Sequence, residues 1–179
     1  MKITNFKLIK GTEGFTLLEL VIVIGILAIL SSSVLVFLNP FEQFKKAQDS
    51  KRKSDLSQIQ KSLESYYNDH VRYPASNSNK IYAQSSGQSP VIIEWGGSWS
   101  PYMTVLPKDP SSSKNYVYYS SADGQTYYIF TSLDRGINDP QACTGGNACA
   151  SLSTLNISGT ACGGTCNFGV SSPNASVGQ

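Results

Sequence analysis

Hydrophobic residues are concentrated at the front of the chain. From Phe15 to Leu38, a run of 24 residues contains a single charged side chain, that of Glu19. A helix rises about 1.5 Å per residue, so this run would be roughly 36 Å long and could cross a hydrocarbon core of about 30 Å. The pattern predicts an apolar helix of membrane-spanning length over residues 15–38, and it raises the question of why one carboxylate is kept there.

A second, amphipathic helical pattern follows directly. Asn39-Pro40 predicts a kink or loosened turn, because proline removes a backbone donor and clashes with the preceding turn. Beyond it, apolar residues recur at spacings of three and four, with lysines and polar residues elsewhere on the helical wheel. The apolar positions are Phe41, Phe44, Leu56, Ile59, Leu63 and Tyr66. We predict that the helix continues over residues 39–70, ends near Asp69, and packs this stripe against a small head.

The head itself has the pattern of a small antiparallel sheet. The sequence RYP at residues 72–74 ends the helix, residues 76–89 have the polar composition of a loop, and PVIIEW at residues 90–95 has that of a strand. The clearest element runs from Tyr116 to Ser132, where two aromatic and β-branched runs flank Asp123-Gly124, a strong hairpin signal. The predicted fold class is α+β, a long N-terminal helical spine packed by a small antiparallel head over residues 71–142.

All four cysteines lie in the last 37 residues, at Cys143, Cys149, Cys162 and Cys166. An even number in a Gly- and Ser-rich tail, behind an apolar segment, predicts two disulfides made in an oxidising compartment. Three pairings are possible, and the sequence does not choose among them. A four-thiolate zinc site is the competing interpretation, but the C-x5-C and C-x3-C spacings differ from the usual paired zinc knuckles. We therefore predict that residues 143–179 form a disulfide-stabilised C-terminal loop.

The charge of the chain excludes little. The formal net charge is +2, and the first fourteen residues supply all of it, since they carry Lys2, Lys7 and Lys10 against Glu13. The remaining chain is neutral, which gives no general argument for nucleic-acid binding.

Three interpretations of the N-terminal segment are open. The first is a transmembrane anchor. The second is a secretory signal peptide with an apolar core at residues 20–30 and small residues at 31–33, although Glu19 interrupts the core and helical signal continues past Ser33. The third starts from Gly14: a short basic leader ends in glycine, and GFTLLELVIVIGILAIL follows without interruption. This sequence resembles the class III leader of type IV pilins and type II secretion pseudopilins.

The resemblance implies processing and an assembly residue. Residues 1–14 would be a prepilin leader, a prepilin peptidase would cut between Gly14 and Phe15, and the new amino terminus of Phe15 would be N-methylated. In this family the glutamate that corresponds to Glu19 meets the amine of a neighbouring subunit in the filament, which implies an assembly role. An intrahelical role is the alternative, because a carboxylate in the first turn favours the helix dipole by about 0.3–1 kcal/mol.

The head carries a second part of the resemblance. RYP, LPKDP at residues 106–110 and the Tyr-rich hairpin look like the head of the major type II pseudopilin and its Gram-positive pilin relatives, so the resemblance extends from Gly14 to Leu133. That family's head ends in an acidic calcium-binding loop, of which only Asp134 and Asp139 correspond here. Calcium takes about six to eight oxygen ligands. A calcium site at Asp134 and Asp139 and a metal-free Asp-rich turn are both open, and no other cofactor is expected.

The expected function is structural. The resemblance implies a subunit that polymerises, after cleavage and N-methylation, into a type IV pilus or a type II secretion-like pseudopilus. It implies as partners further copies of the chain, prepilin peptidase, an inner-membrane assembly platform and minor pilins. The precursor would be a single-pass inner-membrane protein and the product an extracytoplasmic filament.

Two other function classes compete with this one. An enzyme is not expected, because His70 is the only histidine, it lies near a helix end, and the carboxylates are scattered. A membrane-anchored or tip-located module that binds carbohydrate or DNA is the alternative function, and it would need an aromatic surface. Because the hairpin tyrosines alternate, core packing is the favoured use of the aromatic residues.

A basic run on the second helix allows two uses. It comprises Lys45, Lys46, Lys51, Arg52 and Lys53. The run either makes subunit contacts in a filament or forms a solvated helix face.

Overall fold

The computed structural model describes residues 14–84 and 89–178, without the side chains of residues 32–38. The chain divides into two compact units, Met1–Gln43 and Phe44–Gln179. Of the predicted leader, residues 1–13 lie outside the described part.

The first unit contains helix α1, Leu17–Leu38. Thr16 is its N-cap, and Asn39, in the left-handed conformation at φ 39°, ends it. Helix α2 then begins at Pro40, so the interruption lies at Asn39-Pro40, as predicted. Among the residues whose side chains the structure describes, no helix is both long enough and apolar enough to cross a membrane.

Helix α2, Pro40–His70, carries the head. Its buried residues begin at Asp49 and include Leu56, Ile59 and Leu63, which are fully buried. The predicted stripe is wrong at its N-terminal end, since Phe41 and Phe44 are 67% and 62% exposed. Helical spacing places these two rings correctly on the wheel, but it does not say where along α2 the head begins to cover the helix.

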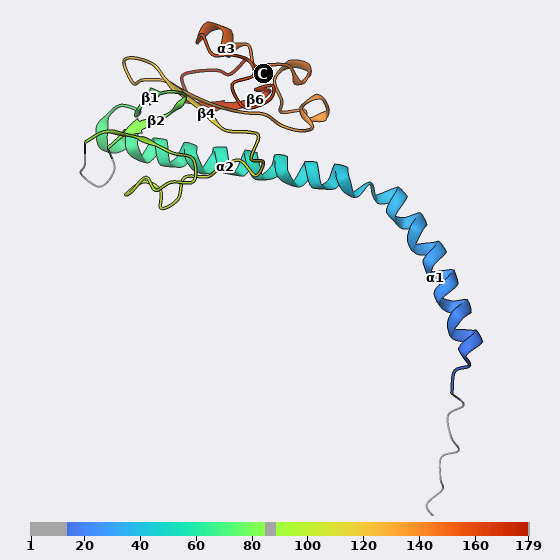
Figure 1. Ribbon diagram of the computed structural model, residues 1–179. Coiled ribbons are helices and arrows are strands. Elements are labelled where there is room, and N and C mark those ends of the chain that lie inside the picture. Colours follow the sequence, from blue (N-terminus) through green and yellow to red (C-terminus); the bar gives the residue numbers. More distant parts are fainter. Residues whose placement is uncertain (1–13, 85–88, 179) are drawn as a thin grey trace, which may run out of the picture. The chain divides into compact units, whose positions relative to one another are not determined.

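The head contains two three-stranded antiparallel sheets (Figure 1). The first has the order β1-β2-β3, and the second the order β4-β5-β6. The strand bounds are β1 Ala75–Asn77, β2 Lys80–Ala83, β3 Val91–Ile93, β4 Val117–Ser120, β5 Tyr127–Thr131 and β6 Phe168–Ser171. The predicted strand within residues 90–95 and the predicted hairpin are confirmed as β3 and as β4–β5.

Two strands lie where residues 76–89 were predicted to form a loop. β1 and β2 are joined by Ser78 and Asn79, whose φ values are 51° and 61°. Positive φ at both positions is the requirement of the tightest hairpin turns, which glycine usually fills. The turn was missed because Ser-Asn is a weak signal for it.

The C-terminal segment is more than a loop. β6 pairs with β5, with Phe130 opposite Gly169, and the segment also forms a short helix α3, Ser151–Thr154. A Cβ at residue 169 would come within 2.8 Å of the Phe130 ring, so the glycine lets that ring pack against the strand. Two single-turn 3₁₀ helices, η1 Gly136–Asn138 and η2 Thr144–Gly146, connect β5 to this segment.

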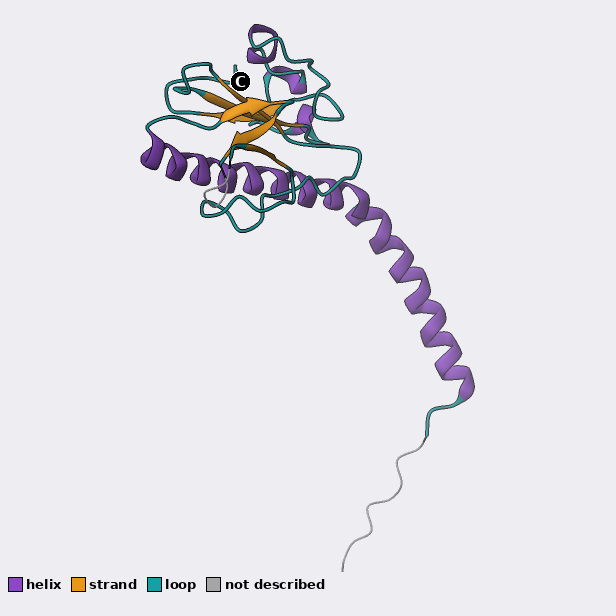
Figure 2. Cartoon of the chain, turned by 60° about the vertical axis from the view of Figure 1, so that its left-hand side comes forward, coloured by secondary structure: helices purple, strands orange, loops and turns teal. Residues whose placement is uncertain are grey.

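Alternation along the second sheet separates two hydrophobic cores. Successive strand residues point to opposite faces. Tyr118 and Ile129 belong to the core beside α2, whereas Val117 and Phe130 belong to a second core with the four cysteines. Both sheets lie on one side of α2 (Figure 2). The segment after β3 also packs on α2, where Ser62 donates to the Tyr102 carbonyl.

Candidate processing and assembly site

The predicted cleavage position lies in an exposed segment before α1. Phe15 is 86% exposed, and no atom lies within 4 Å of the position that a Cβ would take at Gly14. The backbone of residues 14–16 is not part of a helix or strand. A peptide bond that must enter a peptidase needs this kind of access.

Glu19 lies in the first turn of α1. Its backbone N–H donates to the Thr16 Oγ1 at 3.2 Å, which is the N-capping hydrogen bond of the helix. The arrangement matches the first half of a capping box, in which a Thr N-cap is followed three residues later by Glu. The carboxylate is thus held within one turn of the residue that would become the amino terminus. This position suits both interpretations of Glu19, and its role stays a prediction.

The side chains that follow form an uninterrupted apolar surface on α1. Every large apolar side chain from Phe15 to Leu30 is at least 46% exposed. A helix that is apolar on all sides needs a nonpolar environment or other helices around it.

A buried charged cluster fixes the head to α2. The Arg52 side chain is fully buried and donates Nε and Nη2 to the two oxygens of Asp109, at 2.9 and 3.1 Å. Its Nη1 donates to Asp49 at 2.8 Å and to Asp134 at 2.7 Å. One guanidinium therefore joins α2 to two loops of the head.

Sequence reasoning placed Arg52 in a basic run and missed this role. A usable signal was present, because Arg52 lies four residues before Leu56 and seven before Ile59, on the buried stripe itself. Lys53 also binds the head, through Asp139, whereas Lys51 is exposed and pairs with Asp55 of the same helix. Two members of the run, Arg52 and Lys53, thus contact the head and are not part of a solvated face.

The two calcium candidates are neutralised by protein cations. Asp134 accepts from Arg52 and from Lys114 Nζ at 2.6 Å, and Asp139 accepts from Lys53 Nζ at 2.6 and 2.8 Å. Burial acts to raise the pKa of Asp134, but the hydrogen bonds from Lys114 and Arg52 outweigh it and lower that pKa. The described residues include no group of three or more His, Cys, Asp or Glu side chains suited to a metal. The arrangement does not fit a calcium ion, and we propose none.

The cysteines form two disulfides between sequence neighbours. Cys143 pairs with Cys149 and Cys162 with Cys166, which decides among the three possible pairings. All four side chains are buried in the second core.

The aromatic residues serve mainly as core. Tyr66, Tyr73 and Trp99 are at most 8% exposed, and the inward tyrosines of the hairpin are fully buried. His70 is the last residue of α2 and stacks on Tyr66 with ring centroids 4.1 Å apart. The favoured use of these side chains is thus confirmed.

Comparison with known proteins identifies the family. The family model for type II secretion system protein G matches residues 39–148, and the prokaryotic N-terminal methylation motif matches residues 9–35. The chain belongs to the type II secretion system protein G family. As a member, it is a structural subunit of a pseudopilus, which confirms the resemblance and the expected function.

Individual relatives agree with this membership. The type II secretion system core protein G of Vibrio cholerae is 32% identical over 127 residues, which are 70% of this chain and 82% of the relative. The proteins of the same name from Klebsiella pneumoniae and Aeromonas hydrophila are 36% and 35% identical over 104 residues, covering 56% of this chain and 70% and 68% of the relatives. No solved structure matches.

The two matches cover different parts of the chain. The methylation motif contains Gly14, Phe15 and Glu19, and the protein G model covers α2 and both hairpins. The model ends at residue 148. The segment from Cys149 onward, with β6 and the second disulfide, therefore extends beyond the matched head.

Proposed function

We propose that the chain polymerises through its N-terminal helix after cleavage between Gly14 and Phe15 and N-methylation of Phe15, with Glu19 pairing with the Phe15 amine of a neighbouring subunit. The observation that carries the proposal is the position of Glu19: it lies in the first turn of α1, at the start of an exposed apolar surface.

The energetics favour a paired Glu19. A carboxylate at the centre of a bilayer costs about 2.5–3.5 kcal/mol, so an unpaired Glu19 would oppose entry into a bundle of apolar helices. Removal of the leader creates one positive charge, the amine of Phe15. At low dielectric, pairing of these charges offsets the desolvation cost only when the geometry is good. The pair would therefore select one axial register between subunits.

Burial of apolar surface keeps the helices bundled once the filament has left the membrane, where lipid no longer covers them. Shielding apolar area from water contributes about 25 cal/mol per Å², and α1 exposes large side chains along its whole described length. The apolar contacts between helices are nonspecific, and pairing of Glu19 would then select the axial register in which neighbouring helices pack.

The route to the filament follows from the leader. Before assembly, the apolar segment holds the precursor in the inner membrane, where prepilin peptidase and an assembly platform act on it. Further copies of the chain form the main shaft, with minor pilins as additional partners. Support for this route comes from the methylation motif over residues 9–35.

Substitution of Glu19 tests the proposal. Glu19→Ala and Glu19→Gln are expected to abolish filaments sheared from the host cells while cleavage continues, because only the pairing charge is lost. Glu94→Gln is the matched control, since Glu94 is an exposed acid on the head, paired with Lys80. Normal filament yield from Glu19→Ala would contradict the assembly role.

A cross-link separates pairing between subunits from pairing within one chain. Filaments are assembled from ¹⁵N-labelled and unlabelled copies and treated with a carbodiimide, which joins amines to carboxylates directly. Products that join Phe15 of one isotope to Glu19 of the other are expected. Products of a single isotope only would place the pair within one subunit.

A further inference from the structure

We propose that the C-terminal extension, residues 149–178, is an oxidation-dependent latch in which Asn167 holds the segment after β5 against the charged cluster of α2. The latch is a property of the folded head. Only its consequence for assembly rests on the proposed function.

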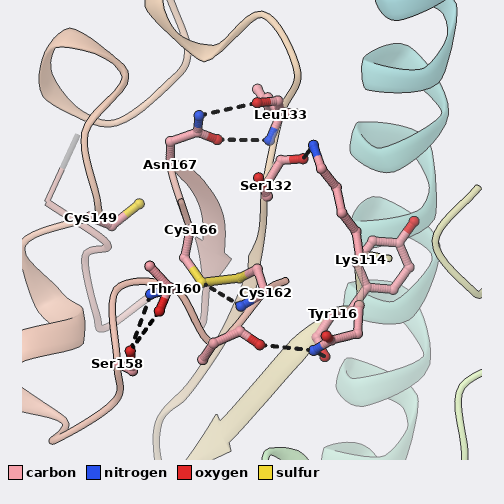
Figure 3. The surroundings of a disulfide bond; sticks show 12 residues. Lys114, Tyr116, Ser132, Leu133, Cys149, Ser158, Thr160, Cys162, Cys166 and Asn167 are labelled. Carbon is pink, nitrogen blue, oxygen red and sulfur yellow. Dashed lines mark hydrogen bonds between the residues drawn. A yellow bond between two sulfur atoms is a disulfide. The ribbon is translucent and has the colours of Figure 1, made fainter. Parts of the chain in front are cut away.

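Asn167 binds the backbone N–H and carbonyl of one residue, Leu133, with both ends of its amide. The Leu133 N–H donates to Asn167 Oδ1 at 2.7 Å, and Asn167 Nδ2 donates to the Leu133 carbonyl at 3.2 Å (Figure 3). The Asn167 side chain is buried, so the two hydrogen bonds are shielded from water. A Cβ at Gly136 would overlap the Asn167 amide nitrogen, which shows how closely the two segments approach.

The gripped segment continues directly into the charged cluster. The N–H groups of Asp134 and Arg135 donate to the two carboxylate oxygens of Asp49 at 2.8 and 2.9 Å. The Asp134 carboxylate accepts from Arg52. Leu133, the residue that Asn167 binds, is therefore followed directly by the two backbone N–H groups that bind Asp49 of α2.

The disulfides constrain the chain just before Asn167, and β6 begins just after it at Phe168. Asn167 follows Cys166, which is bonded to Cys162, and the Asn167 carbonyl accepts from the Cys143 N–H at 2.8 Å. The Cys149 N–H donates to the Cys166 carbonyl at 3.0 Å, so both disulfide loops meet at residues 166–167. On the other side, the Cys162 carbonyl accepts from the Asn115 N–H at 3.1 Å, next to Lys114 of the charged cluster.

Apart from the pairing of β6 with β5, the extension has little apolar burial to hold it in place. Its large buried apolar side chains are few, and the four cysteines make up half of the buried residues in the second core. A segment this poor in apolar residues does not order itself by burial alone. With the thiols reduced, the backbone around residues 162–167 loses its covalent constraint, and the grip on Leu133 weakens.

Closure of the latch is thiol–disulfide exchange. The two thiols of Cys162 and Cys166 become one disulfide and pass two electrons and two protons to an external disulfide, which leaves as two thiols. The second pair reacts in the same way. A chain in a reducing compartment therefore has an open latch, and a chain in an oxidising compartment closes it before it joins a filament.

Amide hydrogen exchange tests the latch in the detergent-solubilised full chain. Reduction with dithiothreitol is expected to accelerate exchange of the Leu133, Asp134 and Arg135 amides by about tenfold or more, while the amides of Ile81 and Tyr82 in the first sheet change little. Unchanged exchange at residues 133–135, or equal acceleration in the first sheet, would overturn the latch. This measurement needs no polymerisation, so its failure is distinct from failure of the proposed function.

Substitutions identify Asn167 as the positioning residue. Asn167→Ala in the oxidised chain should reproduce the local acceleration, and Asn174→Ala is the matched control, since Asn174 also donates to a backbone carbonyl but far from Leu133. Gly136→Ala should accelerate exchange in the parent chain, because the new Cβ would collide with the Asn167 amide. In a chain that already carries Asn167→Ala, Gly136→Ala should have a smaller effect, because that amide is absent. Additive effects of the two substitutions would contradict direct contact. If Asn167→Ala does not fold, Asn167→Asp, which lacks the donor, provides the same comparison.

Discussion

At the residue scale, one buried arginine connects the head to its helix. Arg52 faces three carboxylates, and a cation buried in this way is costly to remove because its partners are left without compensation. Arg52→Met should lower the free energy of unfolding by about 3–5 kcal/mol, measured by urea unfolding of the oxidised chain. Lys61→Ala, an exposed residue of the same helix, should change it by no more than about 0.5 kcal/mol. If Arg52→Met lowered the free energy of unfolding by no more than Lys61→Ala does, the charged cluster would contribute little to the stability of the head.

The same cluster predicts an acid-sensitive head. Burial acts to raise the pKa values of Asp134 and Asp139, but both pKa values lie below the ordinary value of 3.8. Hydrogen bonds from Lys114 and Arg52 lower that of Asp134, and hydrogen bonds from Lys53 and the Gln141 N–H lower that of Asp139. A lowered folded-state pKa contributes stability that is complete above the unfolded-state value and is lost as pH falls through the folded-state value. Urea midpoints should therefore fall as the pH drops below about 4. Asp134→Asn with Asp139→Asn should flatten this fall, and an unchanged pH profile in the double variant would contradict the assignment.

Single residues also show what the sequence alone could and could not reveal. Arg52 occupies a position of the apolar stripe, so its burial was readable from spacing. Its partners Asp109 and Asp134 are 57 and 82 residues away along the chain, and no local pattern connects them to it. The role of Asn167 depends on the fold of the whole extension and was likewise invisible.

At the element scale, α2 packs against the head through only part of its apolar stripe. Leu63 is fully buried in the core beside the sheets. Leu63→Ala should destabilise the head by about 2–5 kcal/mol, from lost burial and the cavity left behind. Thermal unfolding followed by circular dichroism measures the loss, with the exposed Ser57→Ala as control. Equal melting temperatures for the two variants would contradict the observed packing.

Element prediction succeeded where a signal was strong and local. The helix break at Asn39-Pro40, the end of α2 and the hairpin around Asp123-Gly124 each have their own sequence signature. β1 and β2 were missed because their turn uses Ser78 and Asn79 in place of glycine. β6 was missed because its four residues become a strand only through pairing with β5.

At the scale of the whole molecule, the two units have different structural features. The first presents a processing position, a charged first turn and an apolar helix surface, and the second is a folded head with two cores. Sequence and family agree on a pseudopilus subunit. The extension beyond residue 148 lies outside the matched part of the head, and it contains β6 and the Cys162–Cys166 disulfide.

The most direct test of the account is the intact mass and N-terminal sequence of the protein recovered from membranes and from sheared filaments of its host. The account predicts a chain that begins at N-methylated Phe15, carries two disulfides and is enriched in the sheared fraction. A chain that begins at Met1, or after Ser33, would leave Glu19 without a new amine to pair with and would contradict the proposed assembly.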